Sequence, residues 1–141
     1  MIPAERAHLK AFAISHAGMS GKNNEDRYAV AAFRTGGERP ASVLFAIVSD
    51  GIGGHRAGEV ASEMVVESIS QAVAQGNADQ PVQTLREAIM RASQQILVRA
   101  ESDFEMHGMG ATCACALIVN DRLYIAYVGD SRIYLIRGDE I

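Results

Sequence analysis

Acidic residues stand beside glycine or beside one another at three places in the chain. Glu25 and Asp26 precede an expected strand, Asp50 comes after another and is followed by Gly51, and Asp130 follows a glycine. Clustered carboxylates repel one another and raise one another's pKa values unless positive charge lies between them. A hard divalent cation bound by carboxylate and carbonyl oxygens supplies that charge, as Mg²⁺ and Mn²⁺ do in proteins. The spacing therefore predicts a Mg²⁺ or Mn²⁺ site if the fold brings these places together.

The central stretch of the chain indicates how one of these carboxylates is positioned. Six apolar residues, Val43 to Val48, predict a short strand that is buried on both faces. Asp50 then carries a charge out of this strand into a loop, where glycines let the backbone approach a ligand closely. An alternative interpretation is that Asp50 only caps a helix that begins near Ala57.

Hydrophobic periodicity predicts three strands before the first helix. The expected strands cover residues 10–17, 28–33, 43–48, 111–119, 123–128 and 133–136, with one helix from residue 57 and a second around residues 85–96. Strands that follow one another without a helix favour antiparallel pairing over a parallel doubly wound sheet. Because the start of one antiparallel strand lies beside the end of its neighbour, Asp26 and Asp50 are expected at one rim of the sheet.

Composition places the chain among ordinary globular proteins. Its 141 residues are 48% hydrophobic and 21% charged, which suits one domain with a real core. The net charge of -4 and the lack of a Lys/Arg stripe argue against a nucleic-acid partner. No apolar run is long enough for a membrane span and no signal region is evident, so a cytoplasmic location is expected. Cys113 and Cys115 are expected on one side of a strand, as buried, reduced thiols.

Other chemistries fit the sequence less well. Neither residues 51–54 nor residues 108–110 complete a dinucleotide-binding glycine pattern, and the glycine and lysine at positions 21 and 22 lack the upstream glycine of a P-loop. Ser49 and Ser131 lack the spacing of a nucleophile elbow and an evident His-Asp set.

Four short motifs, taken together, resemble those of metal-dependent type-2C serine/threonine protein phosphatases of the bacterial kind. They are Asn24-Glu25-Asp26, residues 49–55 with Ala57-Gly58-Glu59 and Ala61-Ser62, residues 108–112, and residues 128–132 with Tyr134. The resemblance implies an α+β fold, an α-β-β-α sandwich of two antiparallel sheets flanked by helices and incomplete in this chain. Residues 1–141 would be the N-terminal part of a single phosphatase domain.

The resemblance also implies metal-dependent hydrolysis of phosphoserine and phosphothreonine in proteins by a metal-activated water. Asp50 would bridge two Mn²⁺ or Mg²⁺ ions, and the Gly51 carbonyl would bind one of them. Glu25 and Asp26 would bind through water, and Asp130 would join a third, weaker site. Asp50 and Asp26 would thus be the catalytic residues. Phosphorylated proteins are the implied partners, with a serine/threonine kinase and its substrates as candidates, and with neither nucleic acid nor a membrane.

The sequence departs from the family pattern in two respects. The family's phosphate-binding arginine is replaced by Gly21, which leaves the adjacent Lys22 as the candidate for binding the substrate phosphate, as a mobile point charge. Two downstream metal-binding aspartate motifs are not found, so this chain is expected to hydrolyse little by itself. The alternative is a non-catalytic phosphatase-like module that binds a phosphoprotein or a partner domain. Exposed sheet edges would favour a dimer in either case.

Overall fold

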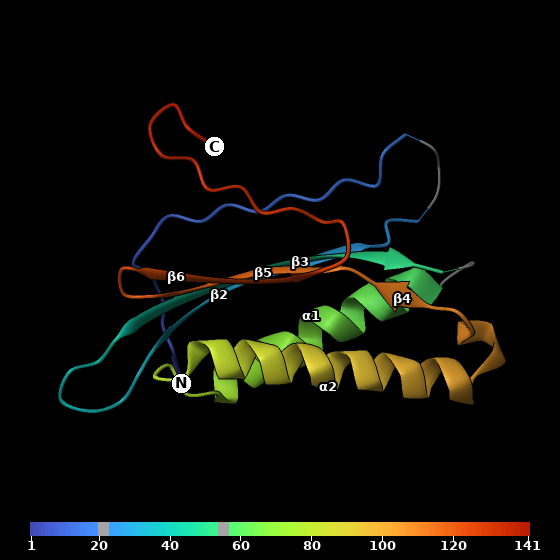
Figure 1. The fold of residues 1–141 in the computed structure, drawn as a ribbon, viewed down its shortest axis with the longest axis horizontal. Coiled ribbons are helices and arrows are strands. Elements are labelled where there is room, and N and C mark those ends of the chain that lie inside the picture. Colours follow the sequence, from blue (N-terminus) through green and yellow to red (C-terminus); the bar gives the residue numbers. More distant parts are fainter. Residues whose placement is uncertain (20–22, 54–56) are drawn as a thin grey trace.

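The computed structural model describes residues 1–19, 23–53 and 57–141, which form one antiparallel sheet with two helices on one face (Figure 1). The strand order is β1-β2-β3-β5-β6, and β4 pairs with the far end of β3. The elements are β1 Ile2–Pro3, β2 Asp26–Arg34, β3 Ser42–Ile52, α1 Ala57–Gln75, α2 Pro81–Ser102, the 3₁₀ turn η1 Phe104–Met106, β4 Gly110–Ala111, β5 Cys113–Val119 and β6 Arg122–Val128. The expected α+β class with antiparallel pairing is confirmed.

The hydrophobic core lies between the sheet and the helices. Alternate residues of β3, namely Val43, Phe45 and Ile47, are almost fully buried against α1 and β5. Helix α1 contributes Ile69 and Val73, which repeat at helical spacing, and neither side chain is accessible to solvent. Burial of apolar area against the helices therefore fixes both the register of β3 and the side of the sheet to which each residue points.

Strand β3 departs from its prediction in two ways. Only its first half is buried on both faces, because Val48 is 48% exposed on the face away from the helices. The strand also continues to Ile52, so that Asp50 lies within the strand and not in a loop beyond it. The extension is stabilised by pairing with β4, in which Gly51 faces Ala111. Glycine at position 51 thus did not end the strand, because β3 pairs with β4 there and the Gly51 N–H donates to the Glu25 carbonyl.

The strands expected at residues 10–17 and 133–136 are not formed. Both segments lack strand pairing in the structure and run over the sheet face opposite the helices (Figure 1). Phe12 and Ile14 are 93% and 92% exposed, so their alternation does not mark a buried face here. A strand needs a hydrogen-bonded neighbour, and neither segment has one among the described residues. Of the two sheets implied by the resemblance, the described chain therefore builds one.

The remaining predictions for local structure are confirmed with small shifts. The hairpin of β2 and β3, both helices and the tight turn at Asn120, whose φ is 53°, are present. The stretch expected as one strand over residues 111–119 is divided at Thr112 into β4 and β5. Cys113 and Cys115 are free, buried thiols of the core. A hydrogen bond with Cys115, and then burial, raise the pKa of the Cys113 thiol, which keeps it protonated.

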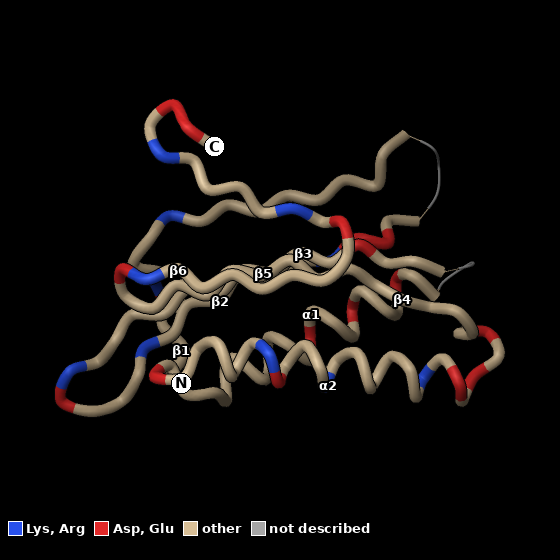
Figure 2. The backbone as a smooth tube through the Cα atoms, viewed as in Figure 1, with Lys and Arg blue, Asp and Glu red and all other residues tan. Residues whose placement is uncertain are grey.

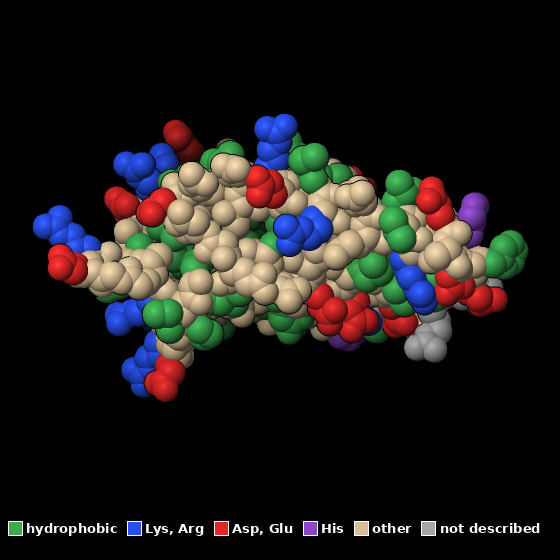
Figure 3. All heavy atoms as spheres, turned by 90° about the horizontal axis from the view of Figure 1, so that it is seen from below, with side chains coloured by type: hydrophobic (Ala, Val, Ile, Leu, Met, Phe, Trp, Pro, Cys, Tyr) green, Lys and Arg blue, Asp and Glu red, His purple; other side chains and the backbone are tan. Residues whose placement is uncertain are grey.

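The surface over the helices differs in composition from one end of the sheet (Figure 2, Figure 3). Seen from the helical side, hydrophobic, polar and charged side chains are mixed (Figure 3). Acidic positions gather instead at the end of the sheet near β4 (Figure 2). In the part of the chain that the structure describes, neither helix has the length and hydrophobicity of a membrane span.

Candidate metal centre

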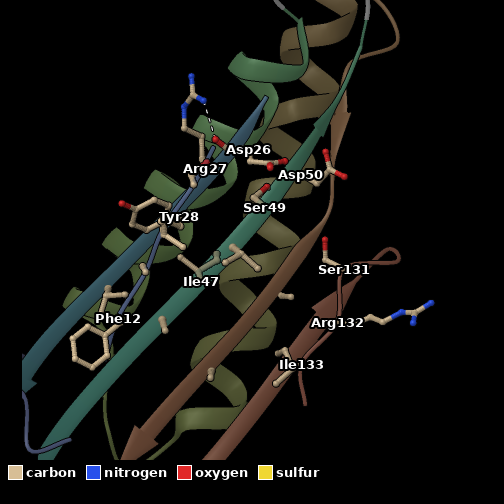
Figure 4. Close-up of a pocket in the computed structure, with 18 of the residues that line it drawn as sticks. Phe12, Asp26, Arg27, Tyr28, Ile47, Ser49, Asp50, Ser131, Arg132 and Ile133 are labelled. Carbon is tan, nitrogen blue, oxygen red and sulfur yellow. Dashed lines mark hydrogen bonds between the residues drawn. The ribbon is translucent and has the colours of Figure 1, made fainter. Parts of the chain in front are cut away.

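The antiparallel register brings two of the predicted site residues face to face. Asp26, the first residue of β2, is the direct partner of Asp50 in β3. Both side chains point away from the helices, and Figure 4 shows them side by side at the same end of the two strands. The rim predicted from strand order alone is thus present in the fold.

The electrostatics of this rim involve all four predicted acidic residues. The pKa of Asp50 is raised above its ordinary value, first by desolvation and then by the negative charges of Asp26 and Asp130. A side-chain hydrogen bond with Asp26 and the charge of Glu25 raise it further. The carboxylates are therefore close enough to repel one another. Among the described residues, however, no three acidic, histidine or cysteine side chains already form a compact metal cage.

The backbone of Gly51 is held in close contact with its surroundings. Its N–H donates to the carbonyl of Glu25 at 3.2 Å, which joins the start of β2 to the end of β3. A Cβ added at Gly51 would overlap the carbonyl group of Gly58 in the first turn of α1 and lie 2.9 Å from the Glu25 carbonyl oxygen. Real Cβ atoms essentially never approach so closely, so glycine is required here by packing.

Thr112 links Asp50 to the segment after β6. Its hydroxyl accepts a hydrogen bond from the Asp50 N–H at 2.9 Å and lies 2.6 Å from the Ser131 hydroxyl. Its backbone N–H donates to the Asp50 carbonyl at 2.8 Å, and its own carbonyl accepts from the buried Ser49 hydroxyl at 2.6 Å. These bonds place the loop that carries Asp130 beside the β2–β3 rim.

Asn24 and Arg27 fix the start of β2. The Asn24 side chain accepts from the Asp26 N–H at 3.0 Å, which is the local turn expected of an Asn two residues upstream. It also donates to the Ser15 hydroxyl at 2.7 Å. Arg27 donates to the carbonyls of Asn24 and Asp26 and reaches Glu59 at 3.9 Å. Arg27 is thus occupied in supporting the backbone.

An open cavity of about 740 Å³ lies beside the carboxylates (Figure 4). Its floor is the open face of β2, β3 and β5, and its walls include residues 12–16 and 131–133. Figure 4 shows Arg132 pointing away from Asp26 and Asp50. Lys22, the predicted phosphate-binding residue, and Gly21 lie outside the described residues.

The structure thus brings Asp26 and Asp50 into direct contact and places Glu25, Gly51 and Asp130 around them. The alternative of Asp50 as a helix cap concerns the start of α1, where residues 54–56 lie outside the described residues. Sequence reasoning missed the contacts of Thr112, Ser131 and Ser62. These polar residues stand within or near the recognised motifs, but no local pattern says which distant backbone group each will meet.

The sequence matches the Protein phosphatase 2C family over residues 15–141. A serine/threonine phosphatase, stp, of Listeria welshimeri is 42% identical over 99 residues, which cover 67% of this chain and 39% of that relative. The protein phosphatase PhpP of Streptococcus pneumoniae is 38% identical over 97 residues, covering 67% of this chain and 39% of that relative. The chain thus spans about two fifths of these curated relatives.

Solved structures agree with the sequence comparisons. A crystal structure of a bacterial serine phosphatase bearing an R161E mutation has a TM-score of 0.78 and 32% identity, covering 90% of this chain and 56% of that one. The catalytic domain of the phosphatase PstP in complex with two manganese ions has a TM-score of 0.59 and 29% identity, covering 76% of this chain and 49% of that one. With motifs, fold and carboxylate rim in agreement, this chain belongs to the Protein phosphatase 2C family.

Proposed function

We propose that this chain is the N-terminal part of a metal-dependent phosphatase that hydrolyses phosphoserine and phosphothreonine in proteins. The observation that carries the proposal is the direct pairing of Asp26 with Asp50, with Glu25 and Asp130 close enough to act on the same carboxyl group. Family membership supports the reaction class, and the manganese ions named for the PstP structure support the choice of metal.

The donor set fits hard divalent cations. Repulsion among carboxylates raises the pKa of Asp50, and an ion bound by oxygen ligands would remove that repulsion. Asp50 would bridge two Mn²⁺ or Mg²⁺ ions, the Gly51 carbonyl would bind one, Glu25 and Asp26 would bind through water, and Asp130 would serve a third site. When bound, such ions lower the pKa of a coordinated water and neutralise charge on the phosphoryl oxygens.

The residues of the chain position these groups. The hydrogen bond from the Asp26 N–H to the Asn24 side chain fixes the backbone at the start of β2. From that position the Asp26 carboxylate would accept a hydrogen bond from an attacking water. The Thr112 hydroxyl fixes the Asp50 backbone, which keeps the two carboxylates opposite each other. The cavity beside them is open to solvent and wide enough for a phosphorylated side chain. Lys22 is proposed to attract the substrate phosphate.

One observation favours a second candidate function, a non-catalytic module that binds a phosphoprotein or a partner domain. Tyr28, Val30 and Val48 lie half exposed together on the open face of the sheet. Apolar groups gathered on one face are typical of surfaces that another protein covers. A dimer through the exposed sheet edges is compatible with both candidates, and a serine/threonine kinase and its substrates are the partners proposed for the phosphatase.

Hydrolysis and metal binding test the first proposal. The protein and its Asp50→Asn variant would be assayed with p-nitrophenyl phosphate and a phosphothreonine peptide in Mn²⁺, with Mn²⁺ affinity measured by calorimetry. We expect Asp50→Asn to lose Mn²⁺ affinity and any turnover. Asp121→Asn is the matched control, because Asp121 lies in the turn at the other end of β5 and β6. Equal Mn²⁺ binding by wild type and Asp50→Asn would contradict the proposal. Metal binding without turnover is expected of this chain alone, and the same result for a longer form that carries the downstream aspartate motifs would favour the second candidate.

A further inference from the structure

Ser62 in helix α1 makes a hydrogen bond outside its own helix. The side chain is fully buried, and its hydroxyl donates to the backbone carbonyl of Glu25 at 2.5 Å. The carbonyl of Glu59, three residues earlier in the helix, is 3.1 Å away. A helical serine commonly bonds to a carbonyl of its own helix. Because a hydroxyl has only one hydrogen to donate, the shorter contact with Glu25 is the main bond.

The Glu25 carbonyl, directly before β2, is hydrogen-bonded to both α1 and β3. It accepts one hydrogen bond from Ser62 in α1 and a second from the Gly51 N–H in β3, at 3.2 Å. Glu25 itself precedes the first residue of β2. The Ser62 hydroxyl thus ties the helix to the two backbone positions that flank the Asp26–Asp50 pair.

Helix α1 also packs closely against the side chain of Glu25. Gly58 lies one turn before Ser62, and a Cβ added there would lie 2.7 Å from a carboxylate oxygen of Glu25. The same glycine blocks any side chain at Gly51 through its carbonyl group. The helix therefore contacts both the carboxylate and the backbone on this side of the site. A change in the distance between Glu25 and α1 would displace both groups.

A second serine in the same helix lacks such a bond. The Ser70 hydroxyl is buried and has no hydrogen-bond partner among the described residues. Burial of a serine hydroxyl in α1 is thus not sufficient to attach the helix to the site. Ser62 and Ser70 can therefore be compared directly. Substitution by alanine removes a hydroxyl bonded to Glu25 at position 62 and a hydroxyl without a hydrogen-bond partner among the described residues at position 70.

We propose that Ser62 is a positioning residue of the metal centre, which sets the placement of the Glu25 carboxylate and the Gly51 carbonyl through its bond to the Glu25 backbone. This inference rests on the proposed function, because it assumes that Glu25 and Gly51 serve the bound ions. Ser62 contacts the backbone carbonyl of Glu25 and is not proposed as a metal ligand. Its effect is expected in the affinity for metal more than in the stability of the metal-free protein.

Calorimetric Mn²⁺ titration and thermal unfolding in EDTA test the inference on the whole chain. We expect Ser62→Ala to raise the Kd for Mn²⁺ about tenfold, as expected when a buried hydrogen bond that shapes a site is lost. Ser70→Ala should leave the Kd unchanged. Val73→Ala, which removes a fully buried core group of the same helix, should lower the Tm in EDTA and still bind Mn²⁺ like the wild type.

Ser62→Cys covers the case in which the alanine variant fails to fold. A thiol occupies a similar volume but donates only weakly, so an intermediate Kd is expected. A wild-type Kd in either Ser62 variant, with binding lost in Asp50→Asn, would overturn this inference and leave the proposed function standing. If Asp50→Asn also bound Mn²⁺ normally, the proposed function itself would fail.

Discussion

The two faces of the sheet differ in what covers them, although the same strands supply both. Toward the helices, β3 presents Val43, Phe45 and Ile47, which are packed in a closed core. On the opposite face it presents Val48 and Asp50, which are exposed to the cavity under residues 12–16. Because side chains alternate along a strand, one register serves both faces. The side chains that stabilise the fold pack on the helix-covered face, and the proposed metal ligands lie on the open face.

The largest expected effect comes from the helix-covered face. Phe45→Ala should lower the free energy of unfolding by about 3–5 kcal/mol, because it leaves a cavity where a fully buried ring was packed. Val48→Ala, three residues along the same strand on the open face, should cost about 1 kcal/mol or less. Urea denaturation of both variants measures the difference. Equal losses would show that the open face is as tightly packed as the core.

Gly51→Ala should produce the next largest loss of stability, because Gly51 of β3 lies against the first turn of α1. The added methyl group would overlap the carbonyl group of Gly58, so α1 or β3 must shift. We expect a loss of about 1–3 kcal/mol in stability and at least about a tenfold weaker affinity for Mn²⁺. Gly36→Ala is the matched control, because a Cβ there meets nothing within 4 Å. If Gly51→Ala and Gly36→Ala had the same stability and the same affinity for Mn²⁺, α1 and β3 would not be in close contact at Gly51.

The two faces also differ in how much of their structure could be predicted from the sequence. The apolar run of β3 and the helical stripe of α1 predicted elements that contribute to the core. The run did not predict that only alternate residues are buried in the second half of β3. Antiparallel order likewise predicted that Asp26 meets Asp50. Residues 10–17 place Phe12 and Ile14 on one face, as a strand would, and yet they form no strand, because strand formation depends on a partner that local sequence cannot supply. The bond from Ser62 to Glu25 spans 37 positions, and no local rule specifies it.

A smaller effect concerns the charge of Asp50 without metal. Its pKa is raised in the folded protein, so folding favours the protonated form and the ionised carboxylate opposes folding. That penalty is absent below the ordinary pKa of 3.8 and develops as pH rises through the raised value. In EDTA at pH 7, Asp50→Asn should therefore raise the Tm slightly, by about 2 °C, because solvent screens most of the repulsion.

Thermal unfolding at pH 7 and at pH 3 separates this effect from ordinary packing. The gain of Asp50→Asn in EDTA should disappear at pH 3, where the carboxyl group is protonated in both folded and unfolded chains. Asp121→Asn, far along the sheet, should show no such dependence. With saturating Mn²⁺ at pH 7 the order should reverse, since only the wild type gains stability from the ions. A gain that persisted at pH 3 would mean that charge repulsion is not its cause.

The smallest effect is expected in the segment that covers the open face. Phe12→Ser should change the free energy of unfolding of this chain by less than about 0.5 kcal/mol, because the ring is already 93% exposed and loses little burial. Chemical denaturation beside Phe45→Ala measures the contrast between two phenylalanines of one chain. If the Phe12 ring contributed to a packed second layer, its substitution would lower the free energy of unfolding as Phe45→Ala does. A loss above about 2 kcal/mol for Phe12→Ser would show that residues 10–17 pack against the sheet in solution and that the open face is closed.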